Sequence, residues 1–170
     1  MGRQVLWVNM LFAVCCPPSA VCRLPSAVRR LLSAVCCLLP TTMNKINLKE
    51  KLSLIKDHWN PRIIGELNGQ YLKLVKFEGP FTWHHHETED EMFLVVKGRF
   101  RMEFRESNDS AENAQREIWL EEGEFCIVPR GVEHRPVADE EAHVLLFEPA
   151  TTLNTGNVEN ELTRQKLGWL

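Results

Sequence analysis

Three consecutive histidines and an acidic residue five positions after them are the side chains of this sequence best suited to chemistry. Residues i and i+2 of a strand point to the same face, so His84 and His86 project together and His85 projects away. With the carboxylate of Glu91 and a later histidine, for which His134 is the candidate, they offer three nitrogens and one oxygen. Such a set suits a divalent transition metal such as iron, manganese, nickel, zinc or copper.

The residue types and their spacing alone also allow other interpretations. The carboxylate could come from Glu89 or Asp90 instead of Glu91, and the histidine run could be a surface feature that binds metal only adventitiously. The remaining histidines, His58 and His143, are expected to be structural or solvated. Cys126 lies within a run of apolar residues and is expected to pack as a small apolar side chain.

The elements that must position these residues are short and extended. Runs with strand character are separated by turn signals such as Gly79-Pro80, Lys97-Gly98, Glu122-Gly123 and the segment 138–141. The predicted strands are Gln70–Phe77, Phe81–His86, Glu91–Val96, Arg99–Arg105, Ile118–Leu120, Phe125–Val128 and His143–Phe147. Many short strands with frequent turns predict an all-β sandwich or barrel rather than an α/β fold.

One helix is predicted before the strands. Asn47 and Glu50 have the spacing of a capping box, in which the asparagine side chain binds early amides of the helix. Apolar residues follow at helical spacing as far as Trp59, and Asn60-Pro61 should end the helix after about three turns. We expect this helix to pack on the sheet, with no chemical role.

Two spaced motifs resemble the cupin superfamily, most closely its small cupin-2 type. The first family motif matches His84-x-His86-x4-Glu91-x6-Gly98, except that Gly79 stands one residue closer to His84 than usual. The second matches Gly123-x5-Pro129-x-Gly131-x2-His134, with alanine at 138 in place of the terminal asparagine. The resemblance covers roughly residues 72–147, and the tail 153–157 is similar to the ending of such proteins.

The resemblance implies a double-stranded β-helix, which is a jelly-roll barrel, with a metal ion inside its mouth. The cupin domain would occupy residues 43–170, with the barrel at about 62–150 and a C-terminal tail at 151–170. The motif match makes His84, His86, Glu91 and His134 the ligands of one divalent transition metal ion per chain. Small cupins of this type also commonly form homodimers, and the helix and the tail are the expected covers for open sheet edges.

The implied function is that of a small-molecule metalloenzyme of the oxygenase, isomerase or lyase type. Four ligands leave one or two positions of a five- or six-coordinate metal open, whereas a purely structural site is more often closed. The alternative is a non-catalytic module that binds or senses a small ligand in the same pocket. The expected pocket wall (Phe81, Trp83, Phe93 and Phe125) favours a neutral or aromatic ligand, while Trp83 and Trp119 are otherwise expected in the barrel core. No catalytic residue beyond the metal ligands is identified.

Residues 1–42 differ from the rest of the chain. They hold four of the 20 basic residues, none of the 23 acidic ones and five of the six cysteines. A seven-residue repeat starts at Ala13, but Pro17, Pro18 and Pro25 exclude a continuous helix, so a tandem repeat in the DNA explains it better. We expect residues 1–42 to be an over-extended start with translation from Met43, and a targeting peptide is the alternative.

The composition of residues 43–170 narrows the class of protein. With 16 basic and 23 acidic residues their net charge is −7, which argues against a nucleic-acid partner. A single cysteine in this part indicates a chain that does not depend on disulfides, as expected in the cytoplasm. The chain also lacks the roughly 18 consecutive apolar residues typical of a membrane-spanning helix, so no membrane association is expected.

Overall fold

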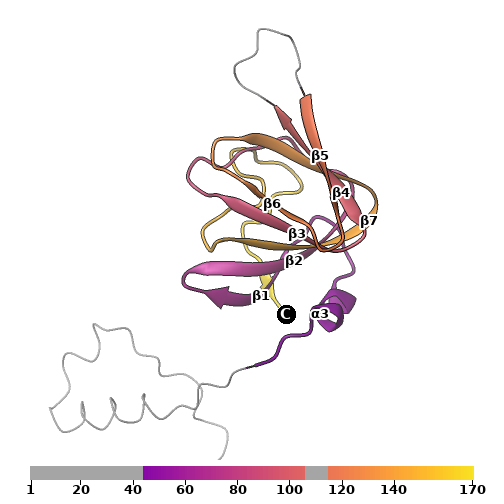
Figure 1. The fold of residues 1–170 in the computed structure, drawn as a ribbon. Coiled ribbons are helices and arrows are strands. Elements are labelled where there is room, and N and C mark those ends of the chain that lie inside the picture. Colours follow the sequence, from indigo (N-terminus) through magenta and orange to yellow (C-terminus); the bar gives the residue numbers. More distant parts are fainter. Residues whose placement is uncertain (1–43, 106–114) are drawn as a thin grey trace, which may run out of the picture. The chain divides into compact units, whose positions relative to one another are not determined.

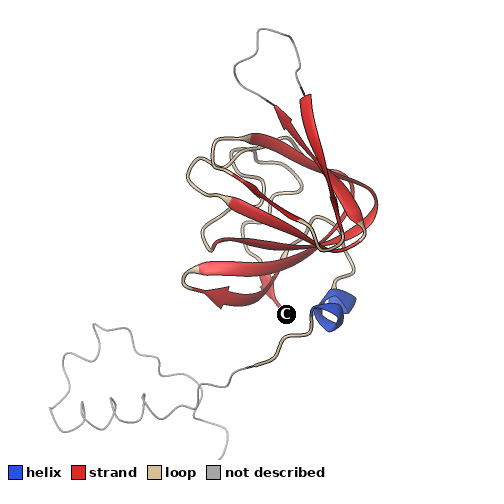
Figure 2. Ribbon diagram, in the orientation of Figure 1, coloured by secondary structure: helices blue, strands red, loops and turns tan. Residues whose placement is uncertain are grey.

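Strands dominate the part of the chain that the computed structural model describes, residues 44–105 and 115–170 (Figures 1 and 2). The described elements are α3 (Leu48–Leu54), β1 (Arg62–Leu67), β2 (Gln70–Pro80), β3 (Glu91–Lys97), β4 (Arg99–Arg105), β5 (Gln115–Glu121), β6 (Phe125–Val128), β7 (Glu133–Pro149) and β8 (Gly168–Trp169). The expectations for residues 1–42 lie outside the described residues. Among those described, no helix is long and apolar enough to cross a membrane.

Strand β7 organises the sheet, because its 17 residues pair with three other strands. Its first part pairs with β4, from Arg101↔Val137 to Arg105↔Glu133, and its second part pairs with β2 on one side and β3 on the other. Strand β6 pairs with β3 and strand β5 with β4. The strands close into the expected jelly-roll barrel with a short N-terminal helix (Figure 2).

Two apolar clusters lie on opposite faces of this sheet. The inner cluster fills the barrel with side chains such as Val75, Phe77, Phe93, Phe100 and Met102. The outer cluster forms where α3 packs on the outside of the sheet and brings together Leu52, Ile55, Ile64, Leu74 and Leu145. The helix is thus the expected cover of an apolar sheet face.

The helix begins as predicted but ends earlier. The Asn47 side chain accepts a hydrogen bond from the Glu50 amide at 3.2 Å, which caps the first turn. The helix ends at Leu54, and Ile55 already has an extended backbone. Trp59, predicted as helical, instead donates its amide to the Lys76 carbonyl and its indole N–H to the Glu78 carbonyl at 2.8 Å. These contacts with β2 outweigh the local helical pattern.

Several strand predictions also need correction. The segment 138–141, predicted as a turn, lies within β7, where the fully buried Ala138 and Ala142 continue the strand and the acidic side chains between them face outward. The segment Phe81–His86 is not a strand and makes only an isolated bridge between His84 and His134. Strands β1 and β8 were not predicted. Strand β8, from the tail, covers the edge of β1 in parallel pairing.

Candidate metal centre

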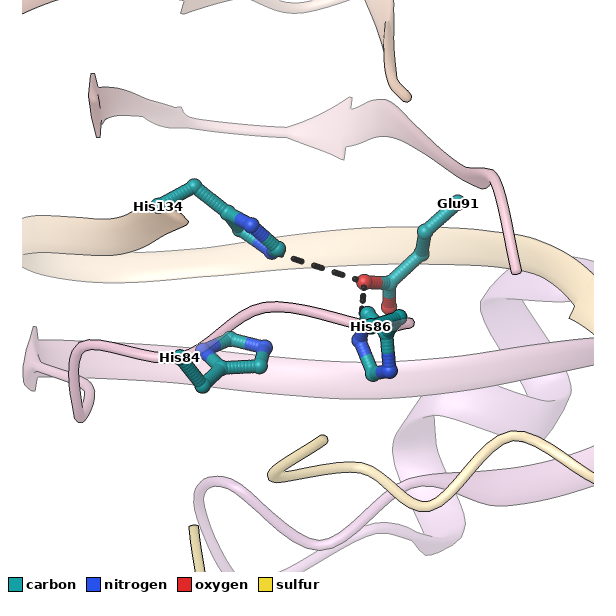
Figure 3. Close-up of side chains that lie close together, drawn as sticks. All are labelled: His84, His86, Glu91 and His134. Carbon is teal, nitrogen blue, oxygen red and sulfur yellow. Dashed lines mark ion pairs between the residues drawn. The ribbon is translucent and has the colours of Figure 1, made fainter. Parts of the chain in front are cut away.

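The four side chains predicted as metal ligands lie together inside the barrel (Figure 3). His84 and His86 come from the segment between β2 and β3, Glu91 is the first residue of β3, and His134 is the second residue of β7. One potential ligand atom from each residue lies within 4.8 Å of the others, and all four side chains are buried. The structure therefore brings two distant motifs to one point.

Backbone hydrogen bonds hold the two motifs against each other. The amide of His84 donates to the His134 carbonyl at 3.1 Å, and the amide of His134 donates back at 2.9 Å. The Gly131 amide donates to the His86 carbonyl at 2.7 Å. Gly131 has a φ of 78°, a conformation that favours glycine, so the turn before His134 depends on this residue.

The alternative carboxylates lie outside the cluster. Asp90 is exposed and accepts a hydrogen bond from the Arg130 amide at 3.0 Å, which ties the two loops together. Glu89 contacts the Thr88 amide. The side chain of His85 points away, as predicted, and pairs with Glu87 at 2.9 Å.

Two carbonyl groups fix the orientation of the imidazoles. The Nδ1 atom of His84 lies 3.1 Å from the Thr82 carbonyl, and that of His134 lies 2.9 Å from the Val132 carbonyl. A carbonyl can only accept, so both Nδ1 atoms carry the proton and both Nε2 atoms keep a free lone pair. This arrangement is the usual outer support of a metal-binding histidine.

The donor atoms that face one another lack ordinary partners. The Nε2 atom of His86 lies 3.2 Å from Oε2 of Glu91, and that of His134 lies 3.6 Å from the same oxygen. None of these three buried atoms has a hydrogen bond of good geometry among the described residues. Buried polar atoms are rarely left so, and their number and kind fit a bound divalent transition metal.

The electrostatics favour the ligand-ready protonation states. Burial, and then the neighbouring His134 and His86, lower the pKa of His84 to about 3, although Glu91 opposes the shift. Burial by itself would raise the pKa of Glu91, but the contacts with His134 and His86 outweigh it and leave the pKa below its ordinary value. A neutral imidazole and an ionised carboxylate are the forms that bind a metal.

An apolar cavity adjoins the cluster. Its volume is about 20 Å³, room for about one water molecule, and it is partly open to solvent. His84 and Glu91 form part of its wall, and the remaining lining residues are Trp59, Pro61, Val75, Phe77, Phe81, Phe93, Pro136, Leu146 and Asn154. The predicted wall residues Phe81 and Phe93 are thus in place.

The other aromatic predictions were wrong. Phe125 is 60% exposed on the outside of β6. Trp83 is half-buried, and the guanidinium groups of Arg105 and Arg135 lie 4.0 Å and 4.8 Å from its ring centroid. Trp119 is 41% exposed on β5 and contacts arginines of β4 in the same way. Stacking on arginine gives both tryptophans a surface partner, so neither needs the core.

A second, open groove runs along the barrel between β5 and β6. Its lining includes Phe104, Ile118 and Cys126, which also pack against the inner cluster. Arg105, Arg116 and Glu133 also line this groove. Burial, helped by the charge of Glu91, raises the pKa of the Cys126 thiol to about 12, so the thiol stays protonated and packs as an apolar group.

Sequence reasoning missed two features beside the centre. Lys73 of β2 and Glu148 of β7 form a buried ion pair, with Nζ 2.6 Å from Oε1. Burial and the charge of Glu91 raise the pKa of Glu148 well above its usual value, while Lys73 opposes the shift. The signal was present in the sequence, because strand alternation places Lys73 on the same face as the core residues Val75 and Phe77.

The second missed feature is the tail, which supports the histidine segment. The side chain of Asn157 accepts a hydrogen bond from the His85 amide at 2.9 Å, and the Asn157 amide donates to the His85 carbonyl at 3.0 Å. Gly156 lies so close that a Cβ atom there would be 2.1 Å from the same carbonyl oxygen. The tail therefore fixes the backbone between His84 and His86.

The remaining histidines form a surface ion group. Glu141 lies 2.8 Å from Nε2 of His143, 3.0 Å from Nε2 of His58 and 3.3 Å from Nζ of Lys76. Hydrogen bonds from His143 and then His58 lower the pKa of Glu141 to about 2. This group joins β2, β7 and the segment before β1 on the outside of the barrel.

Comparisons with known proteins agree with this architecture. Residues 73–148 match the family model for a Cupin domain. A solved cupin-2 domain containing protein from Shewanella frigidimarina is 42% identical, over 61% of this chain and 93% of that one, with a TM-score of 0.55. A Neisseria meningitidis protein of known structure is 33% identical, over 63% and 100% of the two chains, with a TM-score of 0.53.

A curated relative is more distant. The uncharacterized protein YdbB of Bacillus subtilis is 29% identical over 72 residues, which are 42% of this chain and 57% of that protein, so the match spans little more than half of its length. The motifs, the jelly-roll barrel and these matches agree with one another. The chain therefore belongs to the cupin superfamily, as a protein of the cupin-2 type.

Proposed function

We propose that this cupin binds one divalent transition metal ion through His84, His86, Glu91 and His134 and acts on a small molecule held beside it. The observation that carries the proposal is the set of buried donor atoms without partners that face a common point. Each unpaired buried polar atom costs about 1–3 kcal/mol, so a site built this way is favourable only if something binds there. A metal ion satisfies all of them together.

Each part of the site has a separate task in this proposal. The carbonyls of Thr82 and Val132 hold two imidazoles with Nε2 toward the centre. The bound ion would polarise an oxygen of the substrate or, if it is redox-active, activate dioxygen. His84 and Glu91 line the apolar cavity, so the open face of the centre is directed at a ligand in that cavity.

The number of ligands supports a reactive metal centre over a structural one. Four protein ligands leave one or two positions free on a metal that takes five or six, which fits an oxygenase, isomerase or lyase better than a structural site. The cavity wall is aromatic and aliphatic, with Asn154 as its neutral polar member, so the proposed substrate is a small neutral or aromatic molecule.

The second candidate function is a non-catalytic module that binds or senses a small ligand at the same metal. One observation favours it. Among the described residues that line the cavity, the titratable ones are His84 and Glu91, and both belong to the proposed ligand set. The lining therefore offers no separate general acid or base.

Metal-loaded full-length protein separates these functions. The metal-free protein is loaded in turn with ferrous iron, manganese, nickel and zinc, and each form is screened for oxygen uptake and for turnover of diketones, flavonoids and small phenols. If the protein is an enzyme, we expect turnover with at least one metal. This turnover should be lost in His134→Ala and kept in the control His85→Ala. Tight binding of one compound, unchanged and without turnover in every metal form, would replace it with the binding module.

A further inference from the structure

A lysine and a glutamate form an ion pair in the interior of the barrel. The side chains of Lys73 and Glu148 are each 1% exposed, and Nζ lies 2.6 Å from Oε1. Lysine and glutamate are almost never buried this completely unless they are paired. Removing both charges from water is unfavourable, and apolar residues of similar volume often serve the fold as well or better. Stability alone therefore does not account for this pair.

The position of the pair points to the candidate metal centre. Strands β3 and β7 are antiparallel with Met92 opposite Phe147, so the next position along places Glu91 opposite Glu148. Both carboxyl groups are buried, and strand alternation with the inner-cluster residues of β3 and β7 turns both toward the barrel interior. Two carboxylates directly across a strand pair repel each other unless a cation is nearby. Lys73 is the cation in contact with Glu148.

One carboxyl oxygen of Glu148 is paired and the other is not. Oε1 accepts from Lys73, whereas Oε2 has no hydrogen-bond partner of its own among the described residues. Glu91 in turn directs its Oε2 at His86 and His134. Lys73 of β2 contacts Glu148 of β7, the strand register places Glu148 opposite Glu91 of β3, and Glu91 contacts the imidazoles.

We propose that Lys73 and Glu148 are positioning residues of the metal centre. Lys73 holds Glu148 in place, and Glu148 restricts rotation of the Glu91 carboxylate so that one oxygen faces the histidine nitrogens. This inference rests on the proposed binding of a metal by Glu91 and the three histidines. Neither residue of the pair contacts the metal in this scheme, and their effect is on how firmly and in what geometry Glu91 binds it.

The experiment is a cobalt titration of full-length, metal-free protein, with affinity measured against a competing chelator and geometry read from the visible spectrum of bound cobalt. Two variants remove the support: Glu148→Gln, and the double variant Lys73→Met/Glu148→Leu, which leaves an apolar pair. The matched control is Glu103→Gln, because Glu103 is also a buried carboxylate, 3% exposed, but binds Arg101 and Arg135 instead of the centre.

Both support variants are expected to bind cobalt about 10- to 100-fold more weakly, the typical effect of removing an outer partner of a ligand, and to show an altered spectrum. The control should keep the wild-type affinity and spectrum. Folded support variants that match the wild type in both readouts would overturn the proposal, and so would an equal loss in the control. Failure of both variants to fold would assign the pair a structural role and overturn it too. Wild-type protein that binds no cobalt at all would instead refute the metal site itself.

Discussion

The two ends of the barrel interior are built from different residues. One end is packed with apolar side chains such as Phe100 and Met102, both fully buried. The other end holds His84, His86, Glu91 and His134 together with the Lys73–Glu148 pair, all of them buried as well. Burying apolar side chains stabilises a barrel more than burying polar ones. The polar end therefore marks where the residues serve function at the expense of stability.

The largest effect on stability is expected at the apolar end. Phe100→Ala removes a fully buried ring and should lower the free energy of unfolding by about 3–5 kcal/mol. Because Phe100 does not line the cavity, metal affinity should stay at the wild-type value. Chemical denaturation and metal titration of the same variant check both statements. A loss of metal affinity as large as that of a ligand variant would show that the two ends are not separable.

A substitution in the tail next to the polar end should lower both the free energy of unfolding and the metal affinity. In Gly156→Ala the new Cβ atom would meet the His85 carbonyl oxygen, at a φ of 50° that is already unfavourable for alanine. We expect about 1–3 kcal/mol of destabilisation and weaker metal binding, because the histidine segment must shift. Gly69→Ala is the control, since Gly69 has a similar positive φ of 78° but open space around it. Equal metal affinity in the two variants would contradict a role of the tail in holding the segment.

The outer face of the sheet carries apolar residues that the expected homodimer would bury. Apolar residues run across β2, β7, β3 and β6 in two rows of cross-strand pairs, Leu72–Phe147–Met92–Ile127 and Leu74–Leu145–Leu94–Phe125. Helix α3 covers one end of these rows, whereas Phe125 and Ile127 are each 60% exposed. A second copy could cover them.

Phe125→Glu/Ile127→Glu should therefore convert a dimer into a monomer in light scattering, with the monomer still folded. Lys97→Glu, a change of charge at the exposed end of β3, is the control and should leave the dimer intact. A monomeric wild-type protein at micromolar concentration would contradict the expected dimer.

The smallest effect is expected at the surface ion group. The pKa of Glu141 is lowered to about 2 by His143 and His58, so its contribution is present above the ordinary carboxyl pKa of 4.5 and is lost as the pH falls toward 2. The side chain is 40% exposed, and solvent screening keeps the contribution below about 1 kcal/mol. Glu141→Gln should be slightly less stable than wild type at pH 7 and equal to it at the acidic end, whereas Glu140→Gln should match wild type throughout. A difference that grew on acidification would reverse the assignment.

Local patterns predicted the all-β class and several of the strands, whereas the resemblance to the two cupin motifs supplied the jelly-roll barrel and the full set of four candidate ligands. Alternation predicts that His85 points away from its neighbours, and it does so although the segment makes only an isolated bridge and is not a strand. The glycine and proline spacing places His134 after a turn. The predictions failed where contacts between distant residues determine the structure. Trp59 is not part of the helix and hydrogen-bonds to β2 instead. The acidic residues 139–141 resemble a turn, but the buried alanines on either side of them continue strand β7. Strand β8 has only two residues and pairs with β1, about a hundred residues earlier, so no local pattern marks it.

The roles of Lys73 and Glu148 are recognisable only in three dimensions. Strand alternation can mark Lys73 as inward-facing, but only the register of β3 against β7 shows that Glu148 lies opposite Glu91. The same holds for Trp83. Its aromatic type suggests a core position, and only the structure shows its two arginine neighbours.

The central claim is that His84, His86, Glu91 and His134 together hold one metal ion. The most direct measurement is the metal content and zinc affinity of untagged, full-length protein compared with His134→Ala and His85→Ala. We predict one ion per chain in wild type and in His85→Ala, and an affinity lower by more than about 100-fold in His134→Ala, since a lost ligand matters more than a lost outer partner. Equal affinities in all three proteins would contradict it.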